Sequence, residues 1–490
     1  MATIQVYRIN KPIFSISFQG QPMLSTLLQE NGLYVSQPCG GKGTCAKCNI
    51  VIEGDISEPN EKEKACGERL SCQIQLFGDC KLWLEEEEEM EVCFENQTSF
   101  VHIDGEVGYG IAVDIGTTTV ALSLHELQTG KVLAYAGREN PQRSIAADVM
   151  GRIQAVLEGK GELLQSQIIG VLFEMMEEAC EKANISFEKD INSIVITGNT
   201  TMLYILTGKD PKSFATAPFI AEHLFDEKIT LLGKDVYLPP CFSAFVGADI
   251  TCSVLASDMC TKENTALLCD IGTNGEIALW KDGKLHVCST AAGPAFEEAC
   301  IVCGAGGVPG AINQVELQDD TFICKTIENE PAIGICGSGL IDAIAVGLAL
   351  EEIEDTGAMD DDEWYLTDNV YVASMDVRNV QLAKAAIHAG ILALLDDAGI
   401  EASVIENLLI AGGFGSKINI NNAIRIGMFP QETKGKEIIL GNAALRGAQM
   451  MLLSKLERKK LKDIIKNSKT VELASNPVFQ DEYIEQMMFS

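Results

Sequence analysis

Two stretches of the chain repeat one pattern of hydrophobic and polar positions. Residues 110–121 read GIAVDIGTTTVA and residues 266–278 read ALLCDIGTNGEIA, so an apolar run, Asp-Ile-Gly-Thr and a second apolar run occur twice. Successive apolar residues predict a strand buried on both faces, and the glycine allows a tight turn into the next strand. The pattern therefore predicts an internal duplication, with Asp114 and Asp270 each at the end of a strand.

Each predicted turn combines the carboxylate with small residues. The turn residues are Gly116, Thr117 and Thr118 in the first copy and Gly272, Thr273 and Asn274 in the second. Backbone N–H groups and hydroxyls of such a loop can hold phosphate oxygens, while the carboxylate holds a hydrated Mg²⁺ ion. A single copy fits an ordinary β-hairpin with a polar tip about as well. Two copies favour a pair of loops that hold one nucleotide between them.

A third glycine-rich stretch, residues 408–415, reads LLIAGGFG. It predicts a buried strand that ends in glycines, whose missing side chains let the backbone approach a flat ligand. The order of two phosphate loops and a glycine-rich strand end resembles the actin-like ATPase superfamily of acetate and sugar kinases, Hsp70 and actin. The resemblance implies a duplicated α/β (ribonuclease H-like) ATPase of two lobes. It also implies that Asp114 and Asp270 organise Mg²⁺ for catalysis and that adenosine lies beside Gly412, Gly413 and Phe414.

The N-terminal residues predict a small domain with a metal-binding loop. Strand-like runs cover residues 3–7 and 12–18, and a helical stretch covers 23–30. Cys39, Cys45 and Cys48 follow with x5 and x2 spacing, and glycines occupy positions 40, 41 and 43. Glycine permits the backbone angles with which a loop turns its N–H groups toward the sulfurs of a cluster. These residues therefore predict three ligands of one metal centre.

The expected fourth ligand is Cys72, in a segment predicted to return as a strand at 72–76. Cys66, in a charged and exposed loop at 58–68, is the alternative. A four-cysteine zinc site usually has two Cys-x2-Cys pairs, whereas here three ligands lie together and one lies apart, as in 2Fe–2S ferredoxins. The GGKGTC context resembles the ferredoxin family in an x5 variant, which implies an α+β (β-grasp) domain. Cys300 and Cys303 have no second pair nearby and are expected to be inert thiols.

Several polar turns lie between the glycine-rich stretches. Asn199, after a predicted strand, is expected either near phosphate or as a helix cap. Asp249 is expected either near the metal or as an N-cap, and Gly337 and Ser338 open a helix whose N-terminus suits phosphate. Glu297, with Glu298 beside it, is a candidate for orienting the attacking water, although first-turn helix acids have the same pattern.

Length and charge limit the remaining possibilities. A chain of 490 residues predicts two to four units. We expect a ferredoxin domain at 1–94, an acidic linker at 95–107, and lobes at 108–247 and 248–490, with a C-terminal helix that returns to the core. The net charge of −33 argues against nucleic acid or an anionic membrane as partner. No apolar run predicts a membrane span, and 17 cysteines without an export signal predict metal ligands and buried thiols in the cytoplasm.

The whole series of motifs resembles the reductive activators of corrinoid proteins in anaerobic methyl-group metabolism. The motifs are the four cysteines with DIGTTT, NPQR, TGNTT, SAFVGAD, DIGTNGE, AAGPAFE, CGSGLIDA, AGGFG and GNAALRGA. The resemblance implies that ATP hydrolysis lets an electron of the 2Fe–2S cluster reduce inactive Co(II) to Co(I) in methyltransferase and O-demethylase systems. It further implies a corrinoid protein and a low-potential electron donor protein as partners, and it leaves a homodimer through the ATPase domain open.

Other functions stay open at this stage. One alternative is a small-molecule kinase of the actin-like fold with a fused redox-sensing ferredoxin domain. Another is an activator of radical dehydratases, although that family uses a 4Fe–4S cluster between two subunits. A third is a ferredoxin on a nucleotide-sensing scaffold without turnover. One departure from the corrinoid activators is also expected, because the linker runs almost directly into the first phosphate loop without a separate middle domain.

Overall fold

The computed structural model describes most of the chain. The described residues are 2–8, 11–31, 33, 35, 37, 41–43, 46–84, 102–261, 263–272, 274–293, 295–296 and 300–489. Several sequence predictions fall outside them: Cys39, Cys45, Thr273, Glu297, Glu298 and positions 95–101 of the linker.

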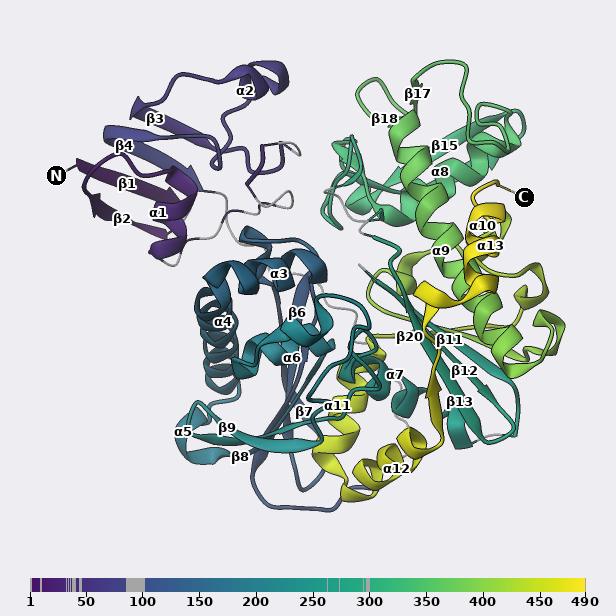
Figure 1. Ribbon diagram of the computed structural model, residues 1–490. Coiled ribbons are helices and arrows are strands. Elements are labelled where there is room, and N and C mark those ends of the chain that lie inside the picture. The colour runs from purple at the N-terminus through teal and green to yellow at the C-terminus, as the bar shows by residue number, and fades with distance from the viewer. Residues whose placement is uncertain are drawn as a thin grey trace.

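The N-terminal domain is a four-stranded sheet with a helix packed on it (Figure 1). The strand order is β2-β1-β4-β3, formed by β1 (Ala2–Arg8), β2 (Lys11–Phe18), β3 (Val51–Ile56) and β4 (Leu76–Leu84). Strands β1 and β4 pair in parallel and the other pairs are antiparallel. Helix α1 (Leu24–Glu30) buries three leucines against this sheet. The expected α+β (β-grasp) arrangement is therefore confirmed.

Two details of the N-terminal prediction are wrong. The strand expected at 72–76 begins only at Leu76, so Cys72 lies in the turn before β4. The loop expected at 58–68 contains helix α2 (Glu61–Cys66), which ends at Gly67 in the left-handed conformation. The charged sequence hides this helix because Glu63, one of its acidic residues, is buried.

The remaining chain contains two six-stranded sheets that match in five strands. The sixth strand differs, because β9 pairs antiparallel with β10 in the first sheet and β21 pairs parallel with β13 in the second. The first has the order β7-β6-β5-β8-β10-β9 and the second β20-β19-β11-β12-β13-β21. In each sheet three antiparallel strands come first and two parallel strands follow, so β5 corresponds to β11 and β8 to β19. The expected duplicated α/β fold is confirmed. Its strands are β5 (Tyr109–Ile115), β6 (Thr119–Glu126), β7 (Val132–Glu139), β8 (Ile191–Gly198), β9 (Glu227–Leu231), β10 (Lys234–Leu238), β11 (Ala266–Ile271), β12 (Gly275–Lys281), β13 (Lys284–Thr290), β19 (Asn407–Ala411), β20 (Glu437–Gly441) and β21 (Ser468–Thr470).

Helices cover both sheets, and two small sheets extend the second lobe (Figure 1). The small sheets are β15-β14-β16 (Thr321–Thr326, Ala311–Gln318, Gly334–Ile335) and β17-β18 (Glu363–Tyr365, Tyr371–Ala373). The helices are α3 (Val149–Ala155), α4 (Gly161–Lys182), α5 (Phe187–Asp190), α6 (Thr200–Thr207), α7 (Ala248–Ser257), α8 (Gly337–Ala349), α9 (Ser374–Ala398), α10 (Ile420–Arg425), α11 (Ala443–Leu453), α12 (Lys455–Lys466) and α13 (Pro477–Glu485).

Helix α11 joins the lobes. It packs on α7 and on β5 and β8 of the first sheet, and one apolar cluster combines residues of these elements with Ala411 of β19. The helices approach at Gly447, where a Cβ atom would lie 2.2 Å from the carbonyl oxygen of Cys252. Only glycine permits this contact. The C-terminal part of the chain thus returns to the first lobe, while the predicted domain boundaries themselves stay a prediction.

The N-terminal domain contacts both lobes. The Gln29 side chain donates to the carbonyl of Ser144 (2.9 Å), and the backbone N–H of Gln37 donates to the carbonyl of Arg143 (3.2 Å). On the second lobe, Lys47 Nζ donates to the carbonyl of Gly304 (3.1 Å). Lys47 lies between Cys45 and Cys48 in the sequence, so the predicted cluster loop itself reaches the second lobe.

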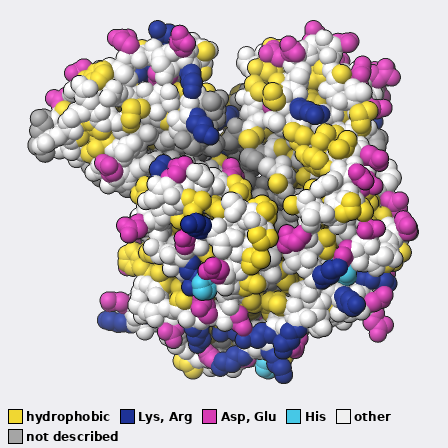
Figure 2. Space-filling model, viewed as in Figure 1, with side chains coloured by type: hydrophobic (Ala, Val, Ile, Leu, Met, Phe, Trp, Pro, Cys, Tyr) yellow, Lys and Arg dark blue, Asp and Glu magenta, His cyan; other side chains and the backbone are white. Residues whose placement is uncertain are grey.

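Basic side chains gather over α12, at the bottom of the view in Figure 2. Six of the twelve residues of this helix are Lys or Arg and two are acidic, in a chain whose net charge is −33.

Within the described ranges, no helix is both long and apolar enough to cross a membrane.

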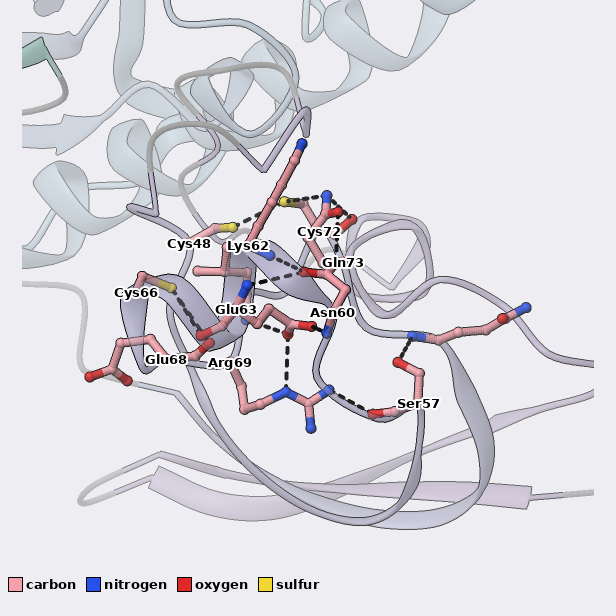
Figure 3. A network of polar contacts seen from close by, with 12 residues as sticks. Cys48, Ser57, Asn60, Lys62, Glu63, Cys66, Glu68, Arg69, Cys72 and Gln73 are labelled. Atoms are coloured by element: carbon pink, nitrogen blue, oxygen red, sulfur yellow. Dashed lines mark hydrogen bonds and ion pairs between the residues drawn. The ribbon is translucent and has the colours of Figure 1, made fainter.

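Glu63 fixes the turn that carries Cys72 (Figure 3). Its carboxylate accepts hydrogen bonds from the backbone N–H groups of Asn60 and Leu70 and from Arg69 Nε, each at 3.0 Å. Burial opposes ionisation, but these donors outweigh it and hold the pKa of Glu63 below its usual value. The charged carboxylate therefore stabilises the segment between α2 and β4.

We expect Glu63→Gln to destabilise the N-terminal domain by about 1–3 kcal/mol, because the amide offers one acceptor oxygen where three donors converge. Thermal melting followed through cluster absorbance measures this change. Glu61→Gln, on the exposed side of the same helix, is the matched control and should melt as the wild type does. Because the folded-state pKa is lowered, the contribution is complete above the unfolded pKa of about 4.3 and is lost as the pH falls through the folded pKa. Equal melting of both variants would contradict this role.

Candidate iron–sulfur centre and nucleotide site

Two of the four predicted cluster ligands lie in the described part of the chain, and they are adjacent. The Sγ atoms of Cys48 and Cys72 are 3.3 Å apart and point toward one another (Figure 3). Hydrogen bonding with the Cys72 thiol lowers the pKa of Cys48 to about 6 against the opposing effect of burial. Gln73 Nε2 donates to Cys72 Sγ (3.3 Å), and N–H donors to sulfur influence the potential of a cluster.

The pair fits a shared metal ion. Two thiolates bound at about 2.3 Å to one tetrahedral ion lie roughly 3.8 Å apart, close to the spacing found here. Cys66 faces elsewhere: its Sγ lies near the carbonyls of Glu63 (3.5 Å) and Glu68 (3.7 Å), and the residue is exposed. No group of three metal-binding side chains occurs in the described ranges, which exclude Cys39 and Cys45. The ligand set, and the inertness of Cys300 and Cys303, stay predictions.

Asp114 and Asp270 are both partly buried and lie near each other. They occupy equivalent positions near the ends of β5 and β11. Burial, and then the charge of Asp270, raises the pKa of Asp114 to about 7, although Asn442 Nδ2 donates to its Oδ2 at 3.3 Å. Burial raises the pKa of Asp270 to about 6 despite a hydrogen bond from Ser253 Oγ (3.2 Å). The two copies of the repeated motif therefore face each other, one from each lobe.

A third carboxylate joins them. The N-cap of α7 is Gly247, so the alternative that Asp249 caps this helix is wrong. Burial and then the charges of Asp114 and Asp270 raise the pKa of Asp249 well above its usual value. Gly247 allows the start of α7, which carries Asp249, to lie against Asn199, because a Cβ atom at Gly247 would lie 2.4 Å from Cα of Asn199.

Buried side chains hold the first turn in place. Asn140 Nδ2 donates to the carbonyl of Gly116 (2.9 Å), and Arg152, fully buried on α3, donates to the carbonyl of Thr117. Asn199 donates from Nδ2 to Thr117 Oγ1 (3.1 Å) and caps α6 by accepting from the N–H of Met202 (2.9 Å). The two expectations for Asn199 are thus compatible, since one side chain caps the helix and contacts the turn.

The third glycine-rich stretch ends beside the second turn. Gly412 has φ +91°, and a Cβ atom there would lie 2.7 Å from Asp270 Oδ1. A Cβ atom at Gly413 would have no other atom within 4 Å. The ring of Phe414 stacks on Phe296 at 5.2 Å between centroids, so the second aromatic ring covers one of its faces. This leaves the backbone at Gly412 and Gly413 as the better part of the predicted adenosine surface.

The N-terminus of α8 lies next to this aromatic pair. A Cβ atom at Gly337 would lie 2.3 Å from the carbonyl oxygen of Phe296 and 2.6 Å from the ring of Phe414. Ser338 Oγ donates to the carbonyl of Asn313 (3.1 Å), so its hydroxyl hydrogen is used within the protein. The phosphate contact of this serine stays a prediction.

The sequence analysis missed two functional candidates. Arg152 holds the first turn through Thr117, and it also donates to Gln142 Oε1 (3.1 Å). Glu276 is a buried carboxylate directly opposite Asp270 in the β11–β12 pair. Counting residues across the predicted hairpin would have found Glu276, because DIGTNGE places the glutamate six positions after the aspartate.

Comparison with family models divides the chain into three parts. Residues 10–76 match the 2Fe–2S iron–sulfur cluster binding domain, residues 109–262 match the RACo middle region, and residues 264–490 match the C-terminal domain of RACo, the ASKHA domain. The 2Fe–2S and nucleotide-binding character of the two parts is thereby supported. The region of that name forms the first six-stranded sheet here and begins with β5, so this match agrees with the expectation that the linker runs almost directly into the first phosphate loop.

Characterised relatives match over most of the chain. The corrinoid activation enzyme RamQ of Eubacterium limosum is 34% identical over 421 residues, which are 78% of this chain and 70% of that protein. The [Co(II) methylated amine-specific corrinoid protein] reductase of Methanosarcina barkeri is 25% identical over 433 residues, 78% of this chain and 77% of that protein.

A solved structure shares the fold. The reductive activator for corrinoid, iron–sulfur protein superposes with a TM-score of 0.70 at 24% identity, over 100% of this chain and 98% of that one. The β-grasp domain, the two matching sheets and the paired aspartates fit this relationship. With the extent of the match to RamQ, they establish that the chain belongs to the family of reductive activators of corrinoid proteins.

Proposed function

We propose that the protein uses ATP hydrolysis to reduce the Co(II) form of a corrinoid protein to Co(I). The observation that carries the proposal is that a domain with a ferredoxin-type cysteine site contacts both lobes of an ATPase fold in one chain, through Lys47 and Gln37. A 2Fe–2S cluster held by Cys39, Cys45, Cys48 and Cys72 supplies one electron at low potential. Co(II) gains that electron, and ATP and water become ADP and phosphate.

Asp114 and Asp270 are the residues suited to Mg²⁺. This ion takes one or two carboxylates and completes its shell with water and substrate phosphates. The two carboxylates come from different lobes, and the charge of Asp270 raises the proton affinity of Asp114, so a divalent cation would relieve a repulsion that burial has strengthened. Mg–ATP would therefore draw the two lobes onto one ligand. The phosphates would lie against the turns at 116–118 and 272–274.

ATP has a thermodynamic task in this proposal. Each 59 mV of uphill one-electron transfer disfavours the equilibrium about tenfold. Nucleotide can offset this only through a difference in affinity for the corrinoid partner between the two nucleotide states. Lobes that change their separation with Mg–ATP offer such a difference, because the partner meets two surfaces of the chain.

Further parts of the proposal concern surroundings and partners. The cluster holds one electron, so a low-potential donor protein must reload it after each transfer. We place the protein in the cytoplasm, where a chain with fourteen cysteines and no disulfide in its described part stays reduced. A homodimer through the ATPase lobes is proposed from the family resemblance.

The first prediction from this proposal separates the two candidates for the fourth ligand. Cys72→Ser should lose most of the visible absorbance and the iron of anaerobically purified protein, because Cys72 lies 3.3 Å from Cys48. Cys66→Ser is the matched control and should retain both. A full cluster in the Cys72 variant together with a lost cluster in the Cys66 variant would reverse the assignment.

A second prediction concerns the aspartates. Asp114→Asn and Asp270→Asn should each lower the ATPase rate by about 100-fold or more, because each removes charge from the ion that stabilises the phosphates. Cluster absorbance should stay unchanged. Asp282→Asn, in the exposed turn after β12, provides the control. Wild-type turnover in both cleft variants would exclude the proposed Mg²⁺ site.

The third prediction tests the coupling. Prereduced protein mixed with a Co(II) corrinoid protein should form Co(I), seen by cobalt absorbance, only when Mg–ATP is present, and the corrinoid protein should raise the ATPase rate. Equal Co(I) formation without nucleotide would refute the coupling. Phosphorylation of a small substrate without reductant would instead favour the kinase, and ATP binding without turnover would favour a sensing scaffold.

A further inference from the structure

Glu276, the second residue of β12, is a buried carboxylate without a counterpart in the other lobe. It lies directly opposite Asp270 in the β11–β12 pair, so both side chains project from the same face of the sheet. In the first lobe the residue opposite Asp114 is Ala121. The duplicated hairpins thus differ at this position, and only the second carries an acid.

The folded chain leaves part of this carboxylate unsatisfied. Glu276 is 7% exposed, and its Oε1 has no hydrogen-bond partner among the residues that the structure describes. Buried carboxyl oxygens are normally hydrogen-bonded, so an unpaired one beside a ligand site indicates a partner that arrives with the ligand.

Two partners are chemically suitable, a metal ion and a water molecule. Asp114 and Asp270 already supply the one or two carboxylates that Mg²⁺ usually takes. Among the described residues, no group of three or more His, Cys, Asp or Glu side chains has an arrangement that could hold a metal ion. A water molecule that attacks a phosphate needs one acceptor to orient it, and a carboxylate meets that need.

We propose that Glu276 accepts a hydrogen bond from the water that attacks the terminal phosphate and holds this water in line. The inference rests on the proposed ATP hydrolysis. The water oxygen bonds to the γ-phosphorus as the bond from that phosphorus to the bridging oxygen breaks, and ADP leaves with the electron pair. One water hydrogen stays on the product phosphate and the other passes to solvent as a proton. The sequence analysis named Glu297 as a candidate for this role, and Glu297 lies outside the described ranges.

The test compares Glu276→Gln with wild type in the full-length holoprotein, with a Co(II) corrinoid protein present. The ATPase kcat should fall about 100-fold, since orientation by one group typically contributes 10²–10⁴-fold. KM for Mg–ATP and the affinity for Mg–ADP should stay within about threefold of the wild-type values. The reason is that Glu276 is proposed to contact the water and not the nucleotide. Glu457→Gln is the matched control, since Glu457 is also buried and also has one carboxyl oxygen without a partner in the described structure. It should keep wild-type turnover.

Other results would overturn the inference. Three results would each show that Glu276 does not orient the attacking water. They are a wild-type kcat in Glu276→Gln, recovery of its activity at higher Mg²⁺, and a loss of nucleotide affinity in parallel with kcat. If the glutamine variant does not fold, Glu276→Asp decides: a lowered kcat with unchanged nucleotide affinity supports the inference, and wild-type turnover refutes it. Failure of the proposed function is distinct, because the wild type itself would then show no corrinoid-stimulated ATPase.

Discussion

Repulsion between partly buried carboxylates is the constraint on which the candidate nucleotide site depends. Asp114 comes from the first lobe and Asp249 and Asp270 from the segment that follows it, and burial raises the pKa of each. The protein supplies amide and hydroxyl donors, Asn442 to Asp114 and Ser253 to Asp270, but no cation contacts either aspartate within the described ranges. A countercharge must arrive with the ligand. In the proposed function, the metal of a metal–nucleotide complex supplies this countercharge between the two lobes.

Close backbone contacts keep these acids in one place. Gly247 brings the start of α7 against Asn199, Gly412 brings the end of β19 against Asp270, and Gly447 brings α11 against Cys252. In each case a Cβ atom would overlap with its neighbour. The glycines thus allow neighbouring elements to pack with their backbones in contact. Small residues in GNAALRGA and AGGFG are explained by this packing as well as by any contact with nucleotide.

Sequence patterns predicted the parts of the site that are local. The repeated DIGT phrase predicted two hairpins that end in aspartate, and the structure has them as β5–β6 and β11–β12. Parts that depend on distant contacts were missed. Arg152 meets Thr117 from 35 positions away. The charged segment around Glu63 forms a helix because Leu70 and Arg69, across a turn, bind its carboxylate. The sequence left open whether Asp249 is the N-cap of a helix, because the position of the cap, at Gly247, depends on where α7 begins.

The position of the N-terminal domain has a mechanical consequence. Gln29 and Gln37 anchor it to one lobe, and Lys47, inside the cysteine loop, anchors it to the other. Hydrogen bonds weaken steeply beyond about 3.5 Å. A movement of one lobe by a few ångströms relative to the other therefore cannot preserve the hydrogen bonds of all three residues. The hydrogen bonds of the N-terminal domain therefore depend on the distance between the lobes. The hydrogen bond that is lost first determines which lobe the cysteine loop stays attached to when the lobes move.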